Sequence, residues 1–152
     1  MMELLGDCYK ARLRIFCSFV WDLRTLSKCK DRQVSCIICS DDLQQIYSIG
    51  VNGSAKGYKE DCLCKTASKY TCVHAEANAL VKLRADTPNK ILICSLMPCC
   101  QCASMIANTP GGFSAILWIQ DWKEHDALDI FQSAGIKAGK LKFDGTIEWC
   151  VD

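Results

Sequence analysis

The first half of the chain changes from helical to strand spacing of its apolar residues. Between Leu4 and about Thr25 these residues recur every three or four positions, at Leu5, Cys8, Leu13, Phe16, Val20, Leu23 and, just beyond, Leu26. This pattern predicts a first amphipathic helix. Residues 34–40 and 46–52 are rich in β-branched and apolar residues and are separated by the polar segment 41–45. They predict a β-hairpin whose second strand stops at the Asn-Gly pair at 52 and 53.

The second half alternates between helix-like and strand-like segments. Residues 53–71 are rich in Gly, Lys, Ser and Thr and lack periodicity, which favours a binding loop. After this loop the patterns predict helices over 74–85, 99–108 and 124–135, buried strands over 90–96 and 113–119, and a last strand or hairpin over 140–149. Such an order predicts a central mixed sheet of about five strands with helices on both faces, a three-layer α/β/α fold. We expect a single domain over 1–152, because no repeat, low-complexity tract or linker divides the chain.

Composition narrows the class of partner. The chain has 152 residues, of which 50% are hydrophobic and 23% charged, with a net charge of +1 at pH 7. These values are typical of a globular protein and give no electrostatic signature of a long nucleic acid or a membrane surface. A small-molecule ligand is the better expectation. The basic residues Lys10, Arg12 and Arg14 interrupt the apolar positions near the N-terminus, so we expect no signal peptide, no membrane span and a cytoplasmic protein.

The chain has thirteen cysteines, and this fraction of the residues approaches that of a secreted disulfide scaffold. The count is odd and no export signal accompanies it, so we expect the thiols to be reduced. Clustered thiols in a reducing compartment are typical of metal binding. Cysteines that lie within the predicted helices and strands are most simply small core residues: Cys17, Cys36, Cys39, Cys94 and Cys100.

Two short segments combine into a candidate catalytic zinc site. His74 comes two residues before Glu76 at the start of one predicted helix, and Cys99 and Cys102 lie three apart at the start of the next. Residues three apart on a helix project to the same side, and the free N–H groups of a helix start favour thiolate over thiol. His74, Cys99 and Cys102 would therefore be three zinc ligands with a fourth position left for water. Glu76 would lie beside that water as general acid/base.

Each half of this site also has a simpler interpretation. A single histidine before an apolar helix is more often a capping or core residue, and C-x-x-C arises easily in a cysteine-rich chain. The combination favours the zinc site: H-A-E at one helix start, then a strand, then P-C-x-x-C at the next helix start. A non-catalytic interaction module stabilised by zinc is the alternative from another class, but a closed structural site has no use for Glu76.

Four segments resemble the deoxycytidylate (dCMP) deaminase family, within the zinc-dependent cytidine deaminase superfamily. They are, in chain order, "SKCKDRQV" (27–34), "GVNGSAKG" (50–57), "CVHAEANAL" (72–80) and "MPCCQCA" (97–103). The zinc motifs alone are equally similar to those of cytidine, guanine and tRNA-adenosine deaminases. "NGSAKG" and "HAEANAL" favour the nucleotide branch. The resemblance covers roughly residues 5 to 137 and implies the cytidine-deaminase-like fold.

The resemblance implies hydrolysis of dCMP to dUMP and ammonia, a step that supplies precursor for thymidylate synthesis. Zinc would activate water for attack on C4 of the cytosine, while Glu76 moves protons to N3 and to the departing amine. The alternative substrates are deoxycytidine, dCTP or a 5-substituted dCMP. Residues implied to contact the substrate are Asn52 at the sugar, Arg32 at the phosphate, Trp122 near the base, and Ala75. Turn formation by Asn52, a solvated charge at Arg32 and packing of Trp122 are their simpler interpretations, and Lys28 and Lys56 are weaker phosphate candidates.

The resemblance also implies a second metal site and an assembly. Cys29 and Cys62 correspond to cysteines of a structural zinc in some relatives, and Cys64 and Cys72 could complete four thiolates around it. Free thiols are the alternative. Relatives form hexamers or smaller oligomers, so we expect a homo-oligomer.

One position departs from the family pattern. Members commonly have G-Y-N-G, linked to control by deoxynucleoside triphosphates, where this chain has Val51 in "GVNG". Control by dCTP and dTTP therefore stays open. We expect Mg²⁺ only if a triphosphate effector site exists.

Overall fold

The computed structural model describes residues 6–59, 61–62, 71–84 and 87–152. Its helices are α1 (Gly6–Leu23), the short 3-10 helix η2 (Arg24–Leu26), α2 (Ala75–Val81), α3 (Cys100–Ala107) and α4 (Ala127–Ser133). Its strands are β1 (Ser35–Ser40), β2 (Ile46–Val51), β3 (Gly53–Ser54), β4 (Cys72–Val73), β5 (Lys90–Leu96), β6 (Phe113–Gln120), β7 (Lys137–Leu141) and β8 (Ile147–Val151).

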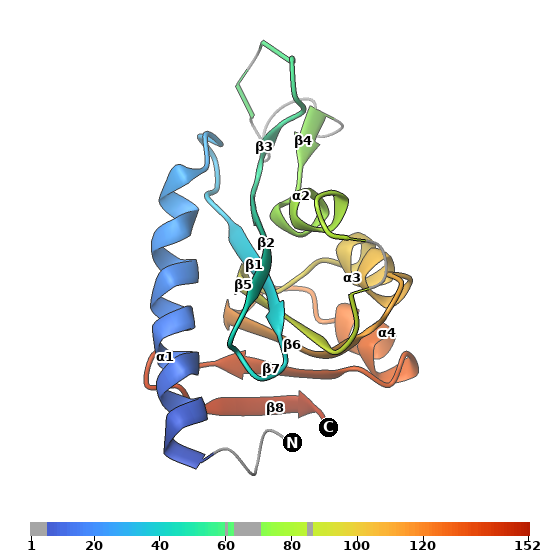
Figure 1. The fold of residues 1–152 in the computed structure, drawn as a ribbon. Coiled ribbons are helices and arrows are strands. Elements are labelled where there is room, and N and C mark those ends of the chain that lie inside the picture. Colours follow the sequence, from blue (N-terminus) through green and yellow to red (C-terminus); the bar gives the residue numbers. More distant parts are fainter. Residues whose placement is uncertain (1–5, 60, 63–70, 85–86) are drawn as a thin grey trace.

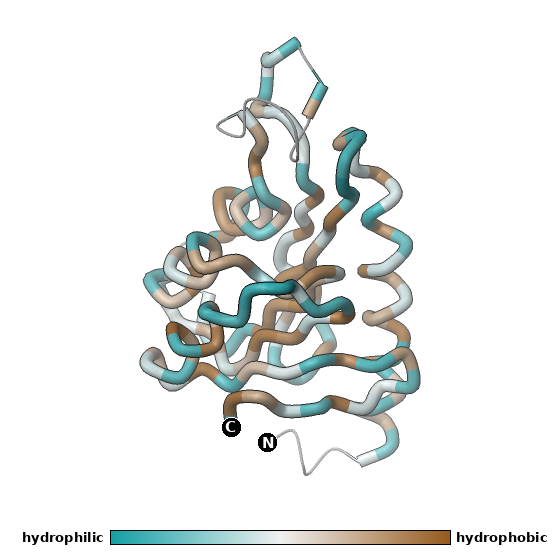
Figure 2. The backbone as a smooth tube through the Cα atoms, turned by 180° about the vertical axis from the view of Figure 1, so that it is seen from behind, coloured by the Kyte–Doolittle hydropathy of each residue, from teal (hydrophilic) through white to brown (hydrophobic). Residues whose placement is uncertain are grey.

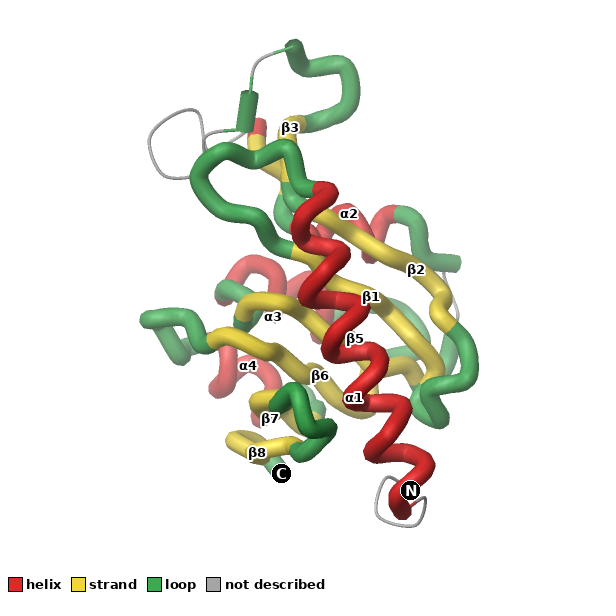
Figure 3. Tube along the Cα trace, turned by 90° about the vertical axis from the view of Figure 1, so that its left-hand side faces the viewer, coloured by secondary structure: helices red, strands yellow, loops and turns green. Residues whose placement is uncertain are grey.

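One mixed sheet organises the molecule. Its strand order is β2-β1-β5-β6-β7-β8, with β5, β6 and β7 parallel and the remaining neighbours antiparallel. Helix α1 covers one face, and α2, α3 and α4 cover the other (Figure 1). The view turned by 90° shows α1 crossing the sheet in front of β1 and β5 (Figure 3). The predicted three-layer α/β/α fold is confirmed.

The sheet has six strands where about five were predicted. The difference lies at the C-terminal end, where 140–149 allowed either one strand or a hairpin. The structure has the hairpin: β7 and β8 pair antiparallel, with Leu141 opposite Ile147. Gly145 lies in the turn at φ 88°, a left-handed conformation that glycine adopts without strain. The turn thus folds the chain back and adds the sixth strand.

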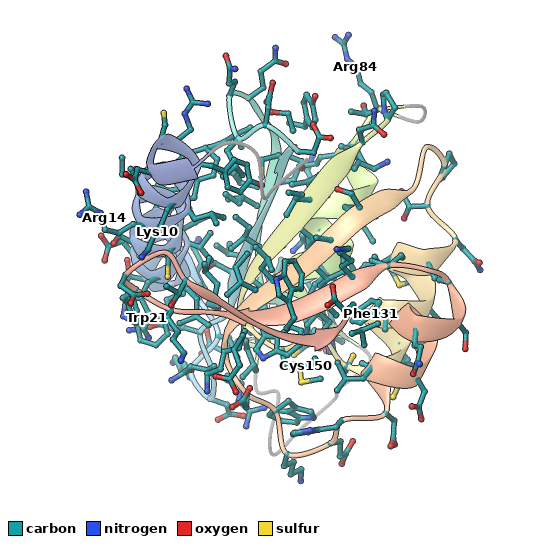
Figure 4. All side chains as sticks on the ribbon, turned by 90° about the horizontal axis from the view of Figure 1, so that it is seen from below. Lys10, Arg14, Trp21, Arg84, Phe131 and Cys150 are labelled. Carbon is teal, nitrogen blue, oxygen red and sulfur yellow. The ribbon has the colours of Figure 1, made fainter. Side chains whose placement is uncertain are left out.

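Two hydrophobic cores lie on the two faces of the sheet. The core beneath α1 contains Leu13, Cys17 and Val20, packed with the residues of β1, β5 and β6 that face this helix. The core on the opposite face lies under α2, α3 and α4 and includes Phe131, which is fully buried. Hydropathy along the backbone shows the central strands as the most apolar part of the chain (Figure 2). Seen from below, Phe131 lies against the sheet, whereas Arg14 extends from α1 to the outside (Figure 4).

Helix α2 is placed by a close approach to β2. A side chain at Gly50 would put its Cβ 2.1 Å from the Ala75 carbonyl oxygen, so only glycine allows this contact. The Ser48 hydroxyl donates a 2.7 Å hydrogen bond to the Ala79 carbonyl. The helix ends at Val81, earlier than predicted, and α4 begins at Ala127, later than predicted. Within the described ranges, no helix is long and apolar enough to cross a membrane.

Candidate active site

Two helix starts meet beside the end of β5. His74 is the residue just before α2, with an extended backbone at φ −68° and ψ 153°. Cys99 takes the same place before α3, three residues after β5 ends at Leu96. Both residues therefore sit where the chain changes direction. Cys102, in the first turn of α3, lies on the same side as Cys99, and Ala103 N–H donates to the Cys99 carbonyl at 2.8 Å.

The three predicted metal ligands lie within bonding reach of one cation. The His74 Nδ1 atom is 3.5 Å from Cys99 Sγ and 3.4 Å from Cys102 Sγ. A zinc ion with bonds of about 2.0 Å to nitrogen and 2.3 Å to sulfur has tetrahedral N–S edges of about 3.5 Å. The spacing and the donor types therefore fit zinc with one coordination position left over. Among the described residues, no other His, Cys, Asp and Glu side chains form such a group.

The protonation of this group favours metal binding. Hydrogen bonds from the Cys102 thiol and, to a smaller extent, from His74 lower the pKa of Cys99 to about 4, although burial acts in the opposite direction. The same thiol–thiol hydrogen bond raises the pKa of Cys102, which is also buried. Hydrogen bonding to Cys99 raises the pKa of His74. The two thiols thus hold one negative charge and one proton between them. A cation bound at this position would displace that proton.

Glu76 is buried beside the ligands, with only 4% of its surface exposed. Its Oε2 atom accepts a hydrogen bond from Cys102 Sγ at 3.4 Å. Burial is the largest influence on this carboxyl and raises its pKa above the usual glutamate value. A carboxyl that holds its proton more tightly than usual is suited to taking a proton from water and passing it on.

His74, Cys99 and Glu76 open into a small cavity of about 90 Å³. Larger cavities exist, including one of about 520 Å³ between α1 and β8, but they contain none of the ligand group. The small cavity contains the candidate ligands His74 and Cys99 and the carboxyl of Glu76. Its lining also includes all four predicted substrate residues. The lining residues are Arg32, Val34, Asn52, His74, Ala75, Glu76, Leu96, Met97, Cys99 and Trp122. Val34, Leu96 and Met97 were not predicted as site residues, because apolar residues at strand ends carry no distinguishing signal.

Asn52 lines the cavity and also holds the loop opposite. Its Oδ1 accepts hydrogen bonds from Val34 N at 2.9 Å and from the Ser27 hydroxyl at 2.6 Å. Its Nδ2 donates to the Arg32 carbonyl at 2.7 Å. The side chain therefore does more than form the Asn-Gly turn. A role in anchoring the segment 27–34 was not predicted, since the sequence does not show which backbone groups the amide will meet.

The other basic candidates lie elsewhere. Lys28 and Lys56 line a separate cavity of about 480 Å³ on the other side of Asn52, together with Lys59. They do not line the catalytic cavity. Arg32 does, and its guanidinium carbon lies 4.3 Å from the centre of the Trp122 ring. Of the three cations considered for the phosphate, the structure brings only Arg32 to the candidate active site.

The cysteines of the predicted second zinc are only partly described. Cys29 and Cys62 are both buried, and their segments run together: Lys30 N–H donates to the Cys62 carbonyl at 3.2 Å. Cys72 lies in β4, half-buried and paired with Ser54. Cys64 lies outside the described residues. The second site therefore stays a prediction.

Comparisons with known proteins point to the same chemistry. A family model described as the cytidine and deoxycytidylate deaminase zinc-binding region matches residues 14–115. The deoxycytidylate deaminase of Homo sapiens is 31% identical over 132 residues, 76% of this chain and 71% of that protein. That of Saccharomyces cerevisiae is 26% identical over 144 residues, 83% of this chain. The chain spans 45% of the yeast protein's length.

A solved structure is similar over most of the fold. The dCMP deaminase from the cyanophage S-TIM5, crystallised in complex with dCMP and dUMP, superposes with a TM-score of 0.73. The match covers 84% of this chain and 94% of the phage protein, at 26% identity.

Proposed function

We propose that this chain, which belongs to the cytidine and deoxycytidylate deaminase zinc-binding family, hydrolyses dCMP to dUMP and ammonia. One observation carries the proposal: His74, Cys99 and Cys102 form a three-ligand group with buried Glu76 beside it. Three ligands leave a coordination position for water, and a carboxyl next to that position has a catalytic use. The relatives named deoxycytidylate deaminase, and the phage protein solved with dCMP and dUMP, support the choice of substrate.

His74, Cys99 and Cys102 would hold a zinc ion, which would supply Lewis-acid activation of water for attack on C4 of the cytosine. Glu76 accepts a proton from the attacking water and delivers it to N3 of the ring. The carboxylate then takes the second proton of that water, from the hydroxyl group now bonded to C4, and transfers it to the exocyclic amine. The C4–N bond breaks, ammonia leaves, and the oxygen remains on C4 as a carbonyl. Burial raises the pKa of Glu76, which favours the protonated carboxyl that this shuttle passes through.

The remaining lining residues hold the base and keep water away from it. Val34, Leu96 and Met97 supply apolar surface, and Ala75 is fully buried between His74 and Glu76. Such a lining favours the flat pyrimidine ring over bulk water. The guanidinium of Arg32 lies at the same cavity and is suited to the phosphate, which it can bind through two parallel N–H donors. Asn52 lines the same cavity, and we propose that it contacts the sugar.

Ammonia release from four substrates tests the proposal: dCMP, deoxycytidine, dCTP and single-stranded DNA. We expect dCMP to have the highest kcat/KM. Glu76→Gln should bind zinc and lose about 10²- to 10⁴-fold in kcat, the usual contribution of a general acid/base. A Glu76→Gln variant that keeps both its zinc and its activity would contradict the mechanism. Preference for another cytosine nucleotide would keep the mechanism and change the substrate. Zinc binding without any deamination would favour the interaction module.

The proposal extends to a second zinc ion, the domain organisation, the location, the assembly and the role of Mg²⁺. We propose a second, structural zinc at Cys29, Cys62, Cys64 and Cys72, which would order the segment after β3. Two zinc ions per chain would support it, and one ion per chain that Cys29→Ser does not change would contradict it.

We also propose a single cytoplasmic domain over 1–152. This domain forms a homo-oligomer, and light scattering of the purified protein tests the assembly. Mg²⁺ enters only with a triphosphate effector, so it should leave dCMP turnover unchanged.

A further inference from the structure

The Arg32–Trp122 pair joins two loops across the mouth of the catalytic cavity. Arg32 lies in the segment before β1, and Trp122 lies just after β6. The guanidinium carbon is 4.3 Å from the centre of the Trp122 ring, within the range of a cation–π contact. Both side chains are half-buried and both line the cavity that contains Glu76. The stack is therefore part of the cavity wall.

The geometry of a guanidinium separates stacking from hydrogen bonding. Stacking on an aromatic ring uses the flat face, whereas the five N–H donors point outward in the plane of the group. The ion pairs found among the described residues join Lys30, Lys137, Lys140 and Lys142 to carboxylates, and none of them includes Arg32. No described carboxylate thus competes with an incoming anion for the donor edge.

Both partners are fixed from behind. The backbone of Arg32 is held by Asn52, whose Nδ2 donates to its carbonyl at 2.7 Å. On the other side, Asp121 precedes Trp122 and accepts hydrogen bonds from Trp118 Nε1 at 2.9 Å and from Lys140 Nζ at 2.6 Å. These bonds anchor the segment that carries the ring. Both backbone segments are therefore restricted before a ligand binds. Little conformational entropy is lost on binding, which favours affinity.

We propose that Trp122 is a positioning residue: it holds the Arg32 guanidinium flat, so that its donor edge is ready for the 5′-phosphate of the substrate. Trp122 thereby sets the preference for a nucleotide over a nucleoside. The inference rests on the proposed function, because it assumes a monophosphate substrate. It differs from the role implied by family resemblance, in which the aromatic residue lies near the base.

The test compares dCMP with deoxycytidine, which lacks the phosphate, in each variant. Trp122→Leu should raise KM for dCMP about 3- to 10-fold more than it raises KM for deoxycytidine, the range of a partly desolvated cation–π contact. Trp122→Phe keeps an aromatic face and should recover most of the loss. Arg32→Lys keeps the charge without the planar fork and should show the same selective loss for dCMP. Arg32→Gln combined with Trp122→Leu should lose no more than Arg32→Gln alone, because Trp122 acts through Arg32.

Two matched controls exist in the chain. Lys123→Gln removes a cation whose Nζ lies 5.8 Å from the same ring but which does not line the cavity. Arg24→Gln removes a guanidinium stacked 3.8 Å over Trp21, outside the cavity lining. Both should keep the wild-type ratio of dCMP to deoxycytidine turnover. Zinc content and the thermal unfolding midpoint of every variant identify any that fail to fold, and Arg32→Lys carries the test if Trp122→Leu is one of them.

Two results would overturn the inference. One is an equal loss for dCMP and deoxycytidine in Trp122→Leu, which would place the ring at the base. The other is additive loss in the double variant. Failure of the proposed function is distinguishable, because the wild-type protein would then not deaminate dCMP at all.

Discussion

The two ends of β5 solve the problem of buried polar groups in opposite ways. At its start, Lys90 is fully buried and its ammonium donates to three carbonyl oxygens, those of Thr87, Pro110 and Gly112. Just past its end, buried Glu76 and Cys102 bond to each other and to residues of the same small group. The first cluster satisfies every donor it contains. In the second cluster the two thiols share a proton, and the cluster opens into the cavity and has room for a cation.

This difference separates a polar cluster that stabilises the fold from a polar cluster that is available for catalysis. Three donors with three acceptors leave Lys90 nothing to offer a ligand. Desolvation by burial lowers the pKa of its ammonium. The cluster at the other end is incomplete in the chain alone: its thiols and imidazole share protons that a metal would displace. Stability should therefore depend on the first end and activity on the second.

The largest expected effect is the loss of activity in Cys102→Ala. Removing one of three ligands should abolish zinc binding and lower deamination about 10³-fold or more, since the metal contributes several kcal/mol to the barrier. The free energy of unfolding of the metal-free protein should change by only about 1 kcal/mol. Zinc content, kcat/KM and urea unfolding measure the three quantities. Cys100→Ala, in the same helix turn but outside the ligand group, is the control and should keep its zinc. Activity retained in Cys102→Ala would remove this residue from the ligand set.

Lys90→Met should have the reverse profile. The substitution keeps an apolar stem and leaves three buried carbonyls without their donor, which should cost about 3 kcal/mol of folding stability. Once folded and loaded with zinc, the variant should have a kcat within about 2-fold of wild type. Urea unfolding and dCMP turnover below the unfolding transition give the two numbers. Lys137→Met, at an exposed ion pair with Asp152, is the matched control and should cost well under 1 kcal/mol. A selective loss of kcat in Lys90→Met would show that the two ends are coupled.

Gly50→Ala should affect both stability and activity, because Gly50 supports the helix that begins beside His74. The new methyl would lie 2.1 Å from the Ala75 carbonyl oxygen and 2.8 Å from Ala79 N, so α2 must move. Overpacking of this kind costs about 1 to 3 kcal/mol, and displacement of Glu76 by about 1 Å can lower kcat about 10²-fold. Gly53→Ala, where a methyl meets no atom within 4 Å, is the control. Unchanged kcat in Gly50→Ala would show that Glu76 tolerates a shift of α2.

The sequence predicted the functional end of β5 better than the structural end. Strand β5 was predicted over its full range because an uninterrupted apolar run has one simple interpretation. The ligands were predicted because H-A-E and P-C-x-x-C each open a predicted helix. Lys90 gave no comparable signal. Its acceptors lie on two other segments of the chain, and a lysine at the start of a strand is normally exposed.

The substrate side of the cavity was predicted as a set of residues without its internal contacts. Arg32, Asn52 and Trp122 were each expected at the ligand, and all three line the cavity. Their contacts with one another depend on where two loops end up after the sheet forms, which local patterns do not encode. For the same reason the sequence left a choice between one strand and a hairpin at the C-terminal end.

The smallest predicted effect concerns Asp121, a polar group at the functional end that is half exposed. The ammonium of Lys140 and the indole N–H of Trp118 hold the pKa of Asp121 below its usual value. Its stabilising contribution is therefore present above the usual aspartate pKa of about 3.9 and is lost as the pH falls through the lower folded value. Solvent screening limits it to about 0.5 kcal/mol, since 49% of the side chain is exposed.

Asp121→Asn should accordingly lower the free energy of unfolding of the metal-free protein by the same small amount at pH 7 and pH 5. At still lower pH the difference from wild type should vanish, because the wild-type carboxyl is then protonated as well. Lys140→Met removes the other partner and should follow the same profile. A difference that grows as the pH falls would mean that Asp121 is not stabilised in its charged form. Since Asp121 anchors the segment that carries Trp122, Asp121→Asn should also raise KM for dCMP slightly, by about 2-fold, without changing deoxycytidine turnover.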